Sequence, residues 1–175
     1  FDIALMYNDS YEEKVASFVN NIRTPNGGTH EAGFRAALTR VISTYNSQNG
    51  AAKEKDVKIS GEDTSEGLIA IVSARVPEPQ FEGQTKGKLG NTYVRPLVQK
   101  STDEIISKYF EEKPIEAKAI VQKSLMAARG REAAKKAREL TRRKDSMSVG
   151  TLPGKLADCQ SKDASICELY LVEGD

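Results

Sequence analysis

The chain has 175 residues, of which 38% are hydrophobic and 29% are charged, and its formal net charge is +1. This composition indicates a globular protein with room for one ordinary domain and the start of a second. The longest apolar stretches, Leu68 to Val72 and Leu169 to Val172, are too short to cross a bilayer, so the sequence predicts no membrane span.

The chain begins at Phe1 with a strand-like pattern in place of a basic and apolar leader. We therefore expect no signal peptide, and the missing initial Met indicates an internal fragment. The two cysteines, Cys159 and Cys167, have no second Cys or His pair at the spacing of zinc ligands. We expect neither a zinc site nor a disulfide, and two reduced cysteines fit a cytoplasmic protein.

Strand-like alternation opens the chain. It runs from Phe1 to Tyr7, and an extended pattern resumes from Val15 to Val19 after the turn residues Asn8, Asp9 and Ser10. Two short extended segments around such a turn are typical of a β-hairpin, which is the structure that we predict here.

A helix is predicted after the breaker residues from Thr24 to Gly28, with Thr29 placed to cap it. His30, the only histidine, lies at its start. A hydrogen-bonding role there is favoured over a general-base role, since the sequence places no nucleophile or carboxylate partner beside it. The apolar residues of this helix recur at helical spacing and should be buried: Phe34, Leu38, Val41, Ile42 and Tyr45.

The middle of the chain contains the most apolar strand. A polar connection from Asn46 to Lys55 leads to a short predicted strand from Asp56 to Ser60. From Gly67 to Val76 the hydrophobicity is nearly continuous, which predicts a central strand covered on both faces. Pro77 and Pro79 should end it.

Two helices are predicted to meet near Pro114. The first contains Pro96 in its first turn and carries the apolar residues Val94, Leu97, Val98, Ile105, Ile106 and Tyr109. The second is a long helix from Ile115 to about Lys144, rich in Ala, Lys, Arg and Glu. A flexible break should follow from Ser146 to Gly150, after which a new unit begins.

Basic residues are concentrated in that long helix. The stretch from Lys118 to Lys144 holds ten basic and two acidic residues, whereas the rest of the chain holds 16 basic and 23 acidic residues. This asymmetry favours a polyanion such as DNA as the partner of one element, but a solvated helix face without a ligand explains it equally well.

The loop from Gln84 to Asn91 combines two lysines, an amide and two glycines. Lys86 offers a mobile positive charge for phosphate oxygens, and Gln84 offers an amide donor. The loop lacks the Walker A pattern of a phosphate-binding loop. By spacing alone, a solvated turn between a strand and a helix explains it better.

The last residues form a second candidate site. An apolar strand beginning at Leu169 should deliver Glu173 and Asp175 at its carboxyl end, where open α/β sheets commonly build their sites. Carboxylates at such a position suit Mg²⁺. A polar turn explains the same residues, and by spacing alone it is favoured.

Four motifs together carry a more specific meaning. In order and spacing they resemble the DNA gyrase B-subunit family of type II topoisomerases, with the related topoisomerase IV subunit as near neighbour. The resemblance covers essentially the whole chain. The motifs are Gly27-Gly28-Thr29-His30-Glu31-Ala32-Gly33-Phe34, Gln84-Thr85-Lys86-Gly87-Lys88-Leu89, Leu152-Pro153-Gly154-Lys155-Leu156-Ala157-Asp158-Cys159 and Leu171-Val172-Glu173-Gly174-Asp175.

The resemblance implies a mixed α/β fold and three parts. Residues 1–113 would be a two-layer transducer domain, similar to a ribosomal-protein domain and containing an unusual left-handed βαβ crossover. Residues 114–146 would be a long basic helical arm, and residues 147–175 the start of a Toprim α/β domain.

The resemblance also implies a function. The whole protein would use ATP to supercoil DNA negatively by double-strand passage. Lys86 would be a catalytic residue that contacts the γ-phosphate beside Gln84, in a nucleotide pocket built mostly by an ATPase domain outside this chain. Glu173 would bind Mg²⁺ and assist DNA cleavage. The fragment alone should be inactive.

Implied partners are the gyrase A subunit, DNA and a second B subunit in an A₂B₂ assembly, with no membrane. Two other classes stay open beside a topoisomerase subunit. One is a stand-alone nucleic-acid-binding module, suggested by the basic helix. The other is a purely structural lever without a chemical residue of its own.

Overall fold

The structure is a computed structural model that describes residues 1–50, 57–149 and 163–168. The chain divides into two compact units, Phe1–Glu132 and Ala133–Asp175. Its elements are β1 (Asp2–Tyr7), β2 (Lys14–Val19), β3 (Ile22–Arg23), α1 (Thr29–Asn49), α2 (Gly61–Ser65), β4 (Leu68–Ala74), β5 (Phe81–Glu82), β6 (Lys88–Leu89), α3 (Val94–Glu112), α4 (Pro114–Val149) and the 3₁₀-helix η1 (Ala164–Ile166).

The main sheet has the strand order β1-β4-β2-β3. The predicted hairpin between the first two strands is therefore wrong, because β4 lies between them, antiparallel to β1 and parallel to β2. The most apolar strand takes the position where both of its edges are paired. The hairpin is formed by β2 and β3 instead, through Asn20 and Asn21, whose φ angles of 48° and 64° suit a tight two-residue turn.

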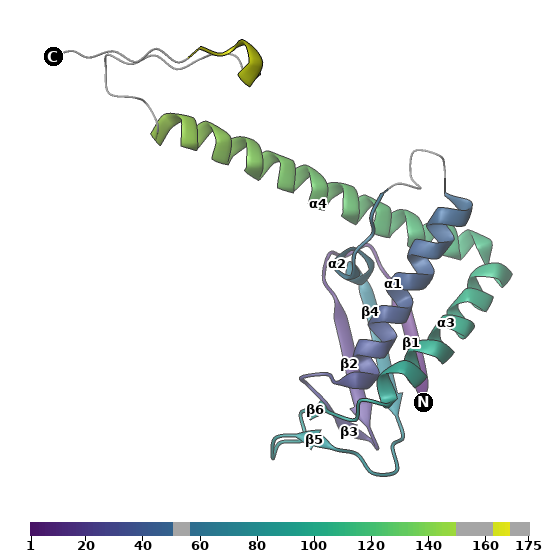
Figure 1. Cartoon of the computed structure of the whole chain (residues 1–175). Coiled ribbons are helices and arrows are strands. Elements are labelled where there is room, and N and C mark those ends of the chain that lie inside the picture. The colour runs from purple at the N-terminus through teal and green to yellow at the C-terminus, as the bar shows by residue number, and fades with distance from the viewer. Residues whose placement is uncertain (51–56, 150–162, 169–175) are drawn as a thin grey trace. The chain divides into compact units, whose positions relative to one another are not determined.

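Within the described part of the first unit, helices cover one face of this sheet (Figure 1). On that face β4 contributes Leu68, Ala70, Val72 and Ala74, all buried. On the other face Ile71 is 50% exposed. The prediction that β4 is central is confirmed, but the prediction that it is covered on both faces is wrong for the described residues. A continuous apolar run does not by itself supply a second layer of helices.

Helix α1 connects the parallel neighbours β2 and β4. In Figure 1 both strands run downwards and α1 passes in front of the sheet from β2 on the left towards β4 on the right, which makes the crossover left-handed. The predicted apolar face of α1 is confirmed, since Phe34 and Ile42 are fully buried. Gly33 allows close packing on α3, because a Cβ atom there would lie 2.6 Å from the Arg95 carbonyl oxygen.

The ends of two elements differ from expectation. Gly28, not Thr29, is the N-cap of α1, and the Thr29 hydroxyl is buried without a hydrogen-bond partner among the described residues. The strand predicted up to Ser60 is absent from residues 57–60. Ser60 instead begins α2 through a capping box with Asp63, a reciprocal pair of hydrogen bonds that periodicity does not reveal.

The two predicted helices around Pro114 are confirmed as α3 and α4. Helix α4 continues to Val149, past the break predicted at Ser146, because no Gly or Pro interrupts it between Arg131 and Val149. Its first part packs on the sheet unit through a buried stripe: Ala117, Val121, Leu125 and Ala128. The start of the implied Toprim domain lies mostly outside the described residues.

Candidate functional site at the Lys86 loop

The predicted phosphate loop forms the tip of a small hairpin. Strands β5 and β6 pair antiparallel, and in Figure 1 they lie at the same end of the sheet as β3. Gly83 and Lys86 both have positive φ angles, 77° and 52°, which fold the intervening residues into a tight turn. The expected turn between a strand and a helix is thus a hairpin of its own, whose strands are too short for an alternation pattern to reveal.

Lys86 and Lys88 differ in their surroundings. Lys88 forms an ion pair of 3.0 Å with Glu82 across the hairpin. Lys86 and Gln84 are exposed, and within the described part of the chain the Lys86 ammonium has no hydrogen-bond or ion-pair partner. The structure therefore brings the two predicted residues together on one turn and leaves the Lys86 charge available for an anion.

The base of the hairpin is attached to the stretch from Thr24 to Gly28, here called the bracing segment. The Asn26 backbone N–H donates to the Gly87 carbonyl at 2.9 Å, and the Leu89 N–H donates to the Gly27 carbonyl at 3.2 Å. Gly28 forms a parallel β-bridge with Leu89, whose side chain is fully buried. From its residues the bracing segment was predicted to be a helix breaker, and Gly27 and Gly28 also belong to a family motif. Neither prediction included the contact with the hairpin, although a Gly-Gly pair is a signal for close backbone approach.

A chain of buried polar groups lies behind the bracing segment. The Ser17 hydroxyl donates to the Thr24 carbonyl at 3.0 Å and lies 2.9 Å from the Thr24 hydroxyl. The Thr24 hydroxyl lies 3.4 Å from His30 Nε2. Burial lowers the pKa of His30, with Glu31 opposing the shift, so the imidazole is neutral near pH 7. His30 thus has the predicted hydrogen-bonding place at the start of α1.

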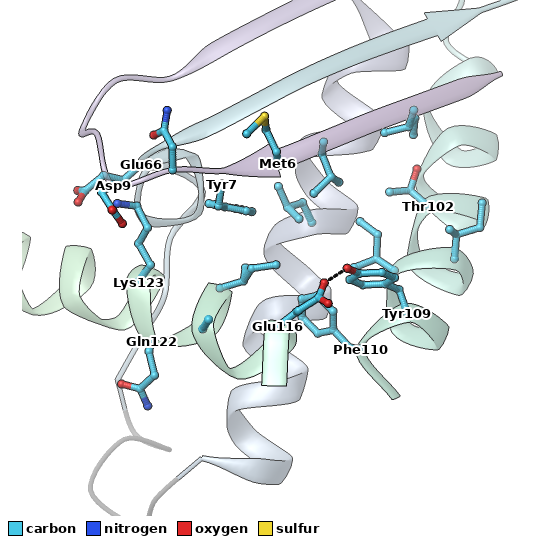
Figure 2. A pocket seen from close by; sticks show the side chains of 18 of the residues that line it. Met6, Tyr7, Asp9, Glu66, Thr102, Tyr109, Phe110, Glu116, Gln122 and Lys123 are labelled. Carbon is cyan, nitrogen blue, oxygen red and sulfur yellow. Dashed lines mark hydrogen bonds between the residues drawn. The ribbon is translucent and has the colours of Figure 1, made fainter. Parts of the chain in front are cut away.

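A large apolar groove lies elsewhere, beside the edge strand β1 (Figure 2). Its volume is about 910 Å³, and β1, α3 and α4 supply most of its lining. Tyr109 donates a hydrogen bond to Glu116 within it, and Lys123 donates to the Ser10 carbonyl at 3.2 Å. Its lining includes none of the predicted site residues. The predicted chemistry and this groove are therefore separate features of the sheet unit.

The predicted metal ligand Glu173 lies outside the described residues, so its role stays a prediction. Among residues 1–50, 57–149 and 163–168, no group of three or more His, Cys, Asp or Glu side chains is placed to hold a metal ion. No helix in these same ranges is both long and apolar enough to cross a membrane.

Comparison with known proteins decides the family. The profile of the DNA gyrase B family matches residues 1–140. The chain belongs to the DNA gyrase B family. It is 74% identical to the DNA gyrase B protein of Campylobacter jejuni over 174 residues, which are 99% of this chain and 23% of that protein.

Solved structures support the same assignment of fold. The 43K ATPase domain of Thermus thermophilus gyrase B, in complex with an aminocoumarin, matches with a TM-score of 0.71 and 40% identity, over 79% of this chain and 37% of that one. A topoisomerase IV ATP-binding domain from Francisella tularensis matches with a TM-score of 0.68 and 31% identity, over 74% and 36%. Identity thus favours gyrase over topoisomerase IV within the gyrase B family.

The chain spans about a quarter of the length of the curated gyrase B relatives, 23% of the protein from C. jejuni and 27% of that from Clostridium acetobutylicum. The similarity therefore concerns one region of those relatives.

Proposed function

We propose that this chain is the central region of a gyrase B protein that negatively supercoils DNA by ATP-driven double-strand passage. In this proposal residues 1–113 are the transducer domain, 114–146 a helical arm and 147–175 the start of a Toprim domain. Family membership supports the proposal, and so does the left-handed β2-α1-β4 crossover that the gyrase resemblance implied.

One observation carries the catalytic part of the proposal, namely the unpartnered charge of Lys86 on a braced hairpin within the described part of the chain. In the whole protein this ammonium would contact the γ-phosphate of ATP bound by the adjacent ATPase domain. Negative charge shifts on the transferring phosphoryl group during hydrolysis, so a positive charge already in place stabilises the transition state. Gln84 on the same turn would donate a hydrogen bond to a phosphate oxygen.

The same contact explains how ATP use could move DNA-handling parts. A ligand biases a conformational change only through contacts that differ between two states. The γ-phosphate would bind Lys86 before hydrolysis and release it afterwards, so loss of this contact would allow the transducer to change position.

The remaining assignments come from the family resemblance. Glu173 would bind Mg²⁺ and assist cleavage of the DNA strand, completed by ligands further along the protein. The partners would be DNA, the gyrase A subunit and a second B subunit, in the cytoplasm. The isolated fragment would lack both a complete nucleotide pocket and a complete metal site.

The decisive experiment compares Lys86→Ala with Lys88→Ala in the full-length gyrase B protein assembled with gyrase A and DNA. Removal of Lys86 should lower the kcat for ATP by about a hundredfold, the size typical for loss of one stabilising group, with little change in nucleotide affinity. Lys88→Ala is the matched control, because Lys88 is already paired with Glu82. Equal turnover in the Lys86 variant and the wild type would remove Lys86 from the catalytic machinery.

A stand-alone nucleic-acid-binding module is the second candidate. Helix α4 presents Lys135, Lys136 and Arg138 to solvent, which is the observation that favours it. Such a module would bind short duplexes tightly, and its affinity would fall steeply with salt. The gyrase proposal predicts weak binding of the fragment to DNA until the other parts of the protein are present. A salt titration of DNA binding by the fragment therefore distinguishes the two candidate functions.

A further inference from the structure

We propose that the bracing segment and His30 are the positioning device of the Lys86 loop: they set where Lys86 stands and transmit its displacement to α1. This inference rests on the proposed contact between Lys86 and the γ-phosphate. It assigns to Thr24, Gly28 and His30 a role that acts through Lys86.

The attachment is made by backbone groups. The bracing segment contacts the hairpin on the carboxyl side of Lys86 through two hydrogen bonds. The Asn26 N–H donates to the Gly87 carbonyl at 2.9 Å, and the Leu89 N–H donates to the Gly27 carbonyl at 3.2 Å. Backbone hydrogen bonds connect main chains directly, without a flexible side chain between them. The position of Lys86 is therefore coupled to that of the bracing segment.

The contact between Gly28 and Leu89 leaves no free space. A Cβ atom on Gly28 would lie 2.5 Å from the Leu89 nitrogen and 2.7 Å from its carbonyl oxygen. Gly28 also has φ 141°, a conformation that L side chains rarely adopt. Two main chains in direct contact cannot absorb a displacement by changing a rotamer, so movement of one is passed to the other.

Gly28 is also the N-cap of α1, and its carbonyl accepts the hydrogen bond of the Ala32 N–H at 2.9 Å. One residue thus belongs to both the contact with the hairpin and the first turn of a long core helix. That helix is anchored further on by Phe34, which is fully buried. A displacement of Lys86 would therefore be transmitted through Gly28 to α1 and to the core of the transducer.

The buried polar chain fixes the bracing segment from behind. One arrangement of protons makes all three contacts of this chain hydrogen bonds. The Ser17 hydroxyl donates to the Thr24 carbonyl, the Thr24 hydroxyl donates to Ser17 Oγ, and His30 Nε2–H donates to the Thr24 hydroxyl. His30 Nδ1 is then a buried acceptor without a partner among the described residues. This buried network holds Thr24 in one place, because any other arrangement of its groups would lose a further hydrogen bond.

The direct test measures the accessibility of the Lys86 amine in the full-length protein. An amine-reactive ester labels Lys86 with and without a non-hydrolysable ATP analogue, and mass spectrometry quantifies the label. In the wild type the analogue should protect Lys86. In Gly28→Ala this protection should be lost and ATP turnover should fall about tenfold or more, because small misplacements cost large factors in rate.

Gly83→Ala is the matched control for that variant. Gly83 also has a positive φ, 77°, and lies on the same hairpin, but a Cβ atom there has no neighbour within 4 Å among the described residues. Gly83→Ala therefore also places a side chain at a positive φ angle, without the collision. Gly83→Ala should keep the protection of Lys86, and loss of protection in both variants to the same degree would overturn the proposal.

A second pair of variants decides the matter if Gly28→Ala fails to fold. Thr24→Val keeps the shape of Thr24 but removes the hydroxyl that His30 and Ser17 share, whereas Thr24→Ser keeps that hydroxyl. Thr24→Val should lose protection of Lys86 and several-fold in kcat, at unchanged affinity for the analogue, and Thr24→Ser should restore both. Wild-type protection and turnover in a folded Thr24→Val variant would overturn the proposal.

The same experiments distinguish a failure of the proposed function from a failure of the positioning role. If the analogue does not protect Lys86 in the wild type and Lys86→Ala keeps full turnover, the proposed function is wrong. If the wild type shows protection and Lys86→Ala is impaired, but Thr24→Val and any folded Gly28→Ala behave as the wild type, only the positioning role is wrong.

Discussion

The Lys86 hairpin and the first part of α4 are both attached to the same sheet unit, by different kinds of groups. The hairpin is held by the buried side chain of Leu89 and also by backbone contacts with Gly27 and Gly28. Helix α4 is held by a stripe of buried side chains that includes Leu125, and by the ion pair of Arg131 with Asp63, whose atoms lie 2.9 Å apart. The contact at Gly28 requires the absence of a side chain, whereas the attachment of α4 depends on the presence of side chains.

This difference bears on how each region tolerates change. Side-chain packing weakens in steps, because a smaller residue still fills part of the space. A backbone contact at glycine has no intermediate, since any added Cβ atom collides. We therefore expect substitutions in α4 to change mainly stability, and substitutions in the bracing segment to change mainly the position of Lys86.

The largest stability effect should come from Leu125→Ala. Leu125 is fully buried, so its truncation removes apolar burial and leaves a cavity. The free energy of unfolding should fall by about 2–5 kcal/mol. Leu140→Ala on the same helix is the control, because Leu140 is 59% exposed and should change stability by about 0.5 kcal/mol or less. Equal costs by denaturant titration would contradict side-chain anchoring of α4.

A smaller effect is expected at the α2 side of the Arg131 attachment. The Ser60 hydroxyl accepts a hydrogen bond from the Asp63 N–H and thereby caps α2, while the Asp63 carboxylate accepts hydrogen bonds from the Arg131 guanidinium. Ser60→Ala should lower the free energy of unfolding by about 1 kcal/mol, the usual cost of losing such a cap. Ser47→Ala, which removes only an exposed hydrogen bond to Thr44, should cost less. The reverse ranking would show that α2 does not depend on its capping box.

The smallest effects are expected from acid, at different pH in the two regions. Burial lowers the pKa of His30, so below its unfolded value of about 6.5 the unfolded chain binds the proton more readily and stability falls. Burial alone would raise the pKa of Asp63, but hydrogen bonds from Arg131 and Ser60 lower it overall. Its contribution is complete above its unfolded pKa of about 4 and is lost as pH falls further.

Denaturant titrations from about pH 7 to about pH 3 should separate these two contributions. His30→Gln should flatten the pH dependence of stability in the window that begins at about pH 6.5 and extends downwards, and Asp63→Asn should flatten it only below about pH 4. A His30→Gln variant with the wild-type slope in the first window would mean that His30 is not buried as a neutral imidazole.

Local patterns were enough to predict several elements. The apolar spacing of Phe34, Leu38 and Ile42 predicted α1, and Pro114 marked the junction of α3 and α4, because helical periodicity and proline geometry act within a few residues. The lysine and the amide of the loop from Gln84 to Lys86 could be read from the sequence in the same way, and their proposed chemistry stays a prediction. The hairpin prediction for the first strands failed because strand pairing depends on partners far away in the chain.

The sequence by itself determined the helices α1, α3 and α4, the apolar core strand β4 and the presence of a lysine and an amide on a glycine-containing turn. Only the tertiary structure decided that β4 separates β1 from β2, and that residues 24–28 brace residues 87–89. Glycine carries no side-chain pattern from which its partner can be predicted, so a contact made by bare backbone becomes visible only when the folded chain brings the two segments together.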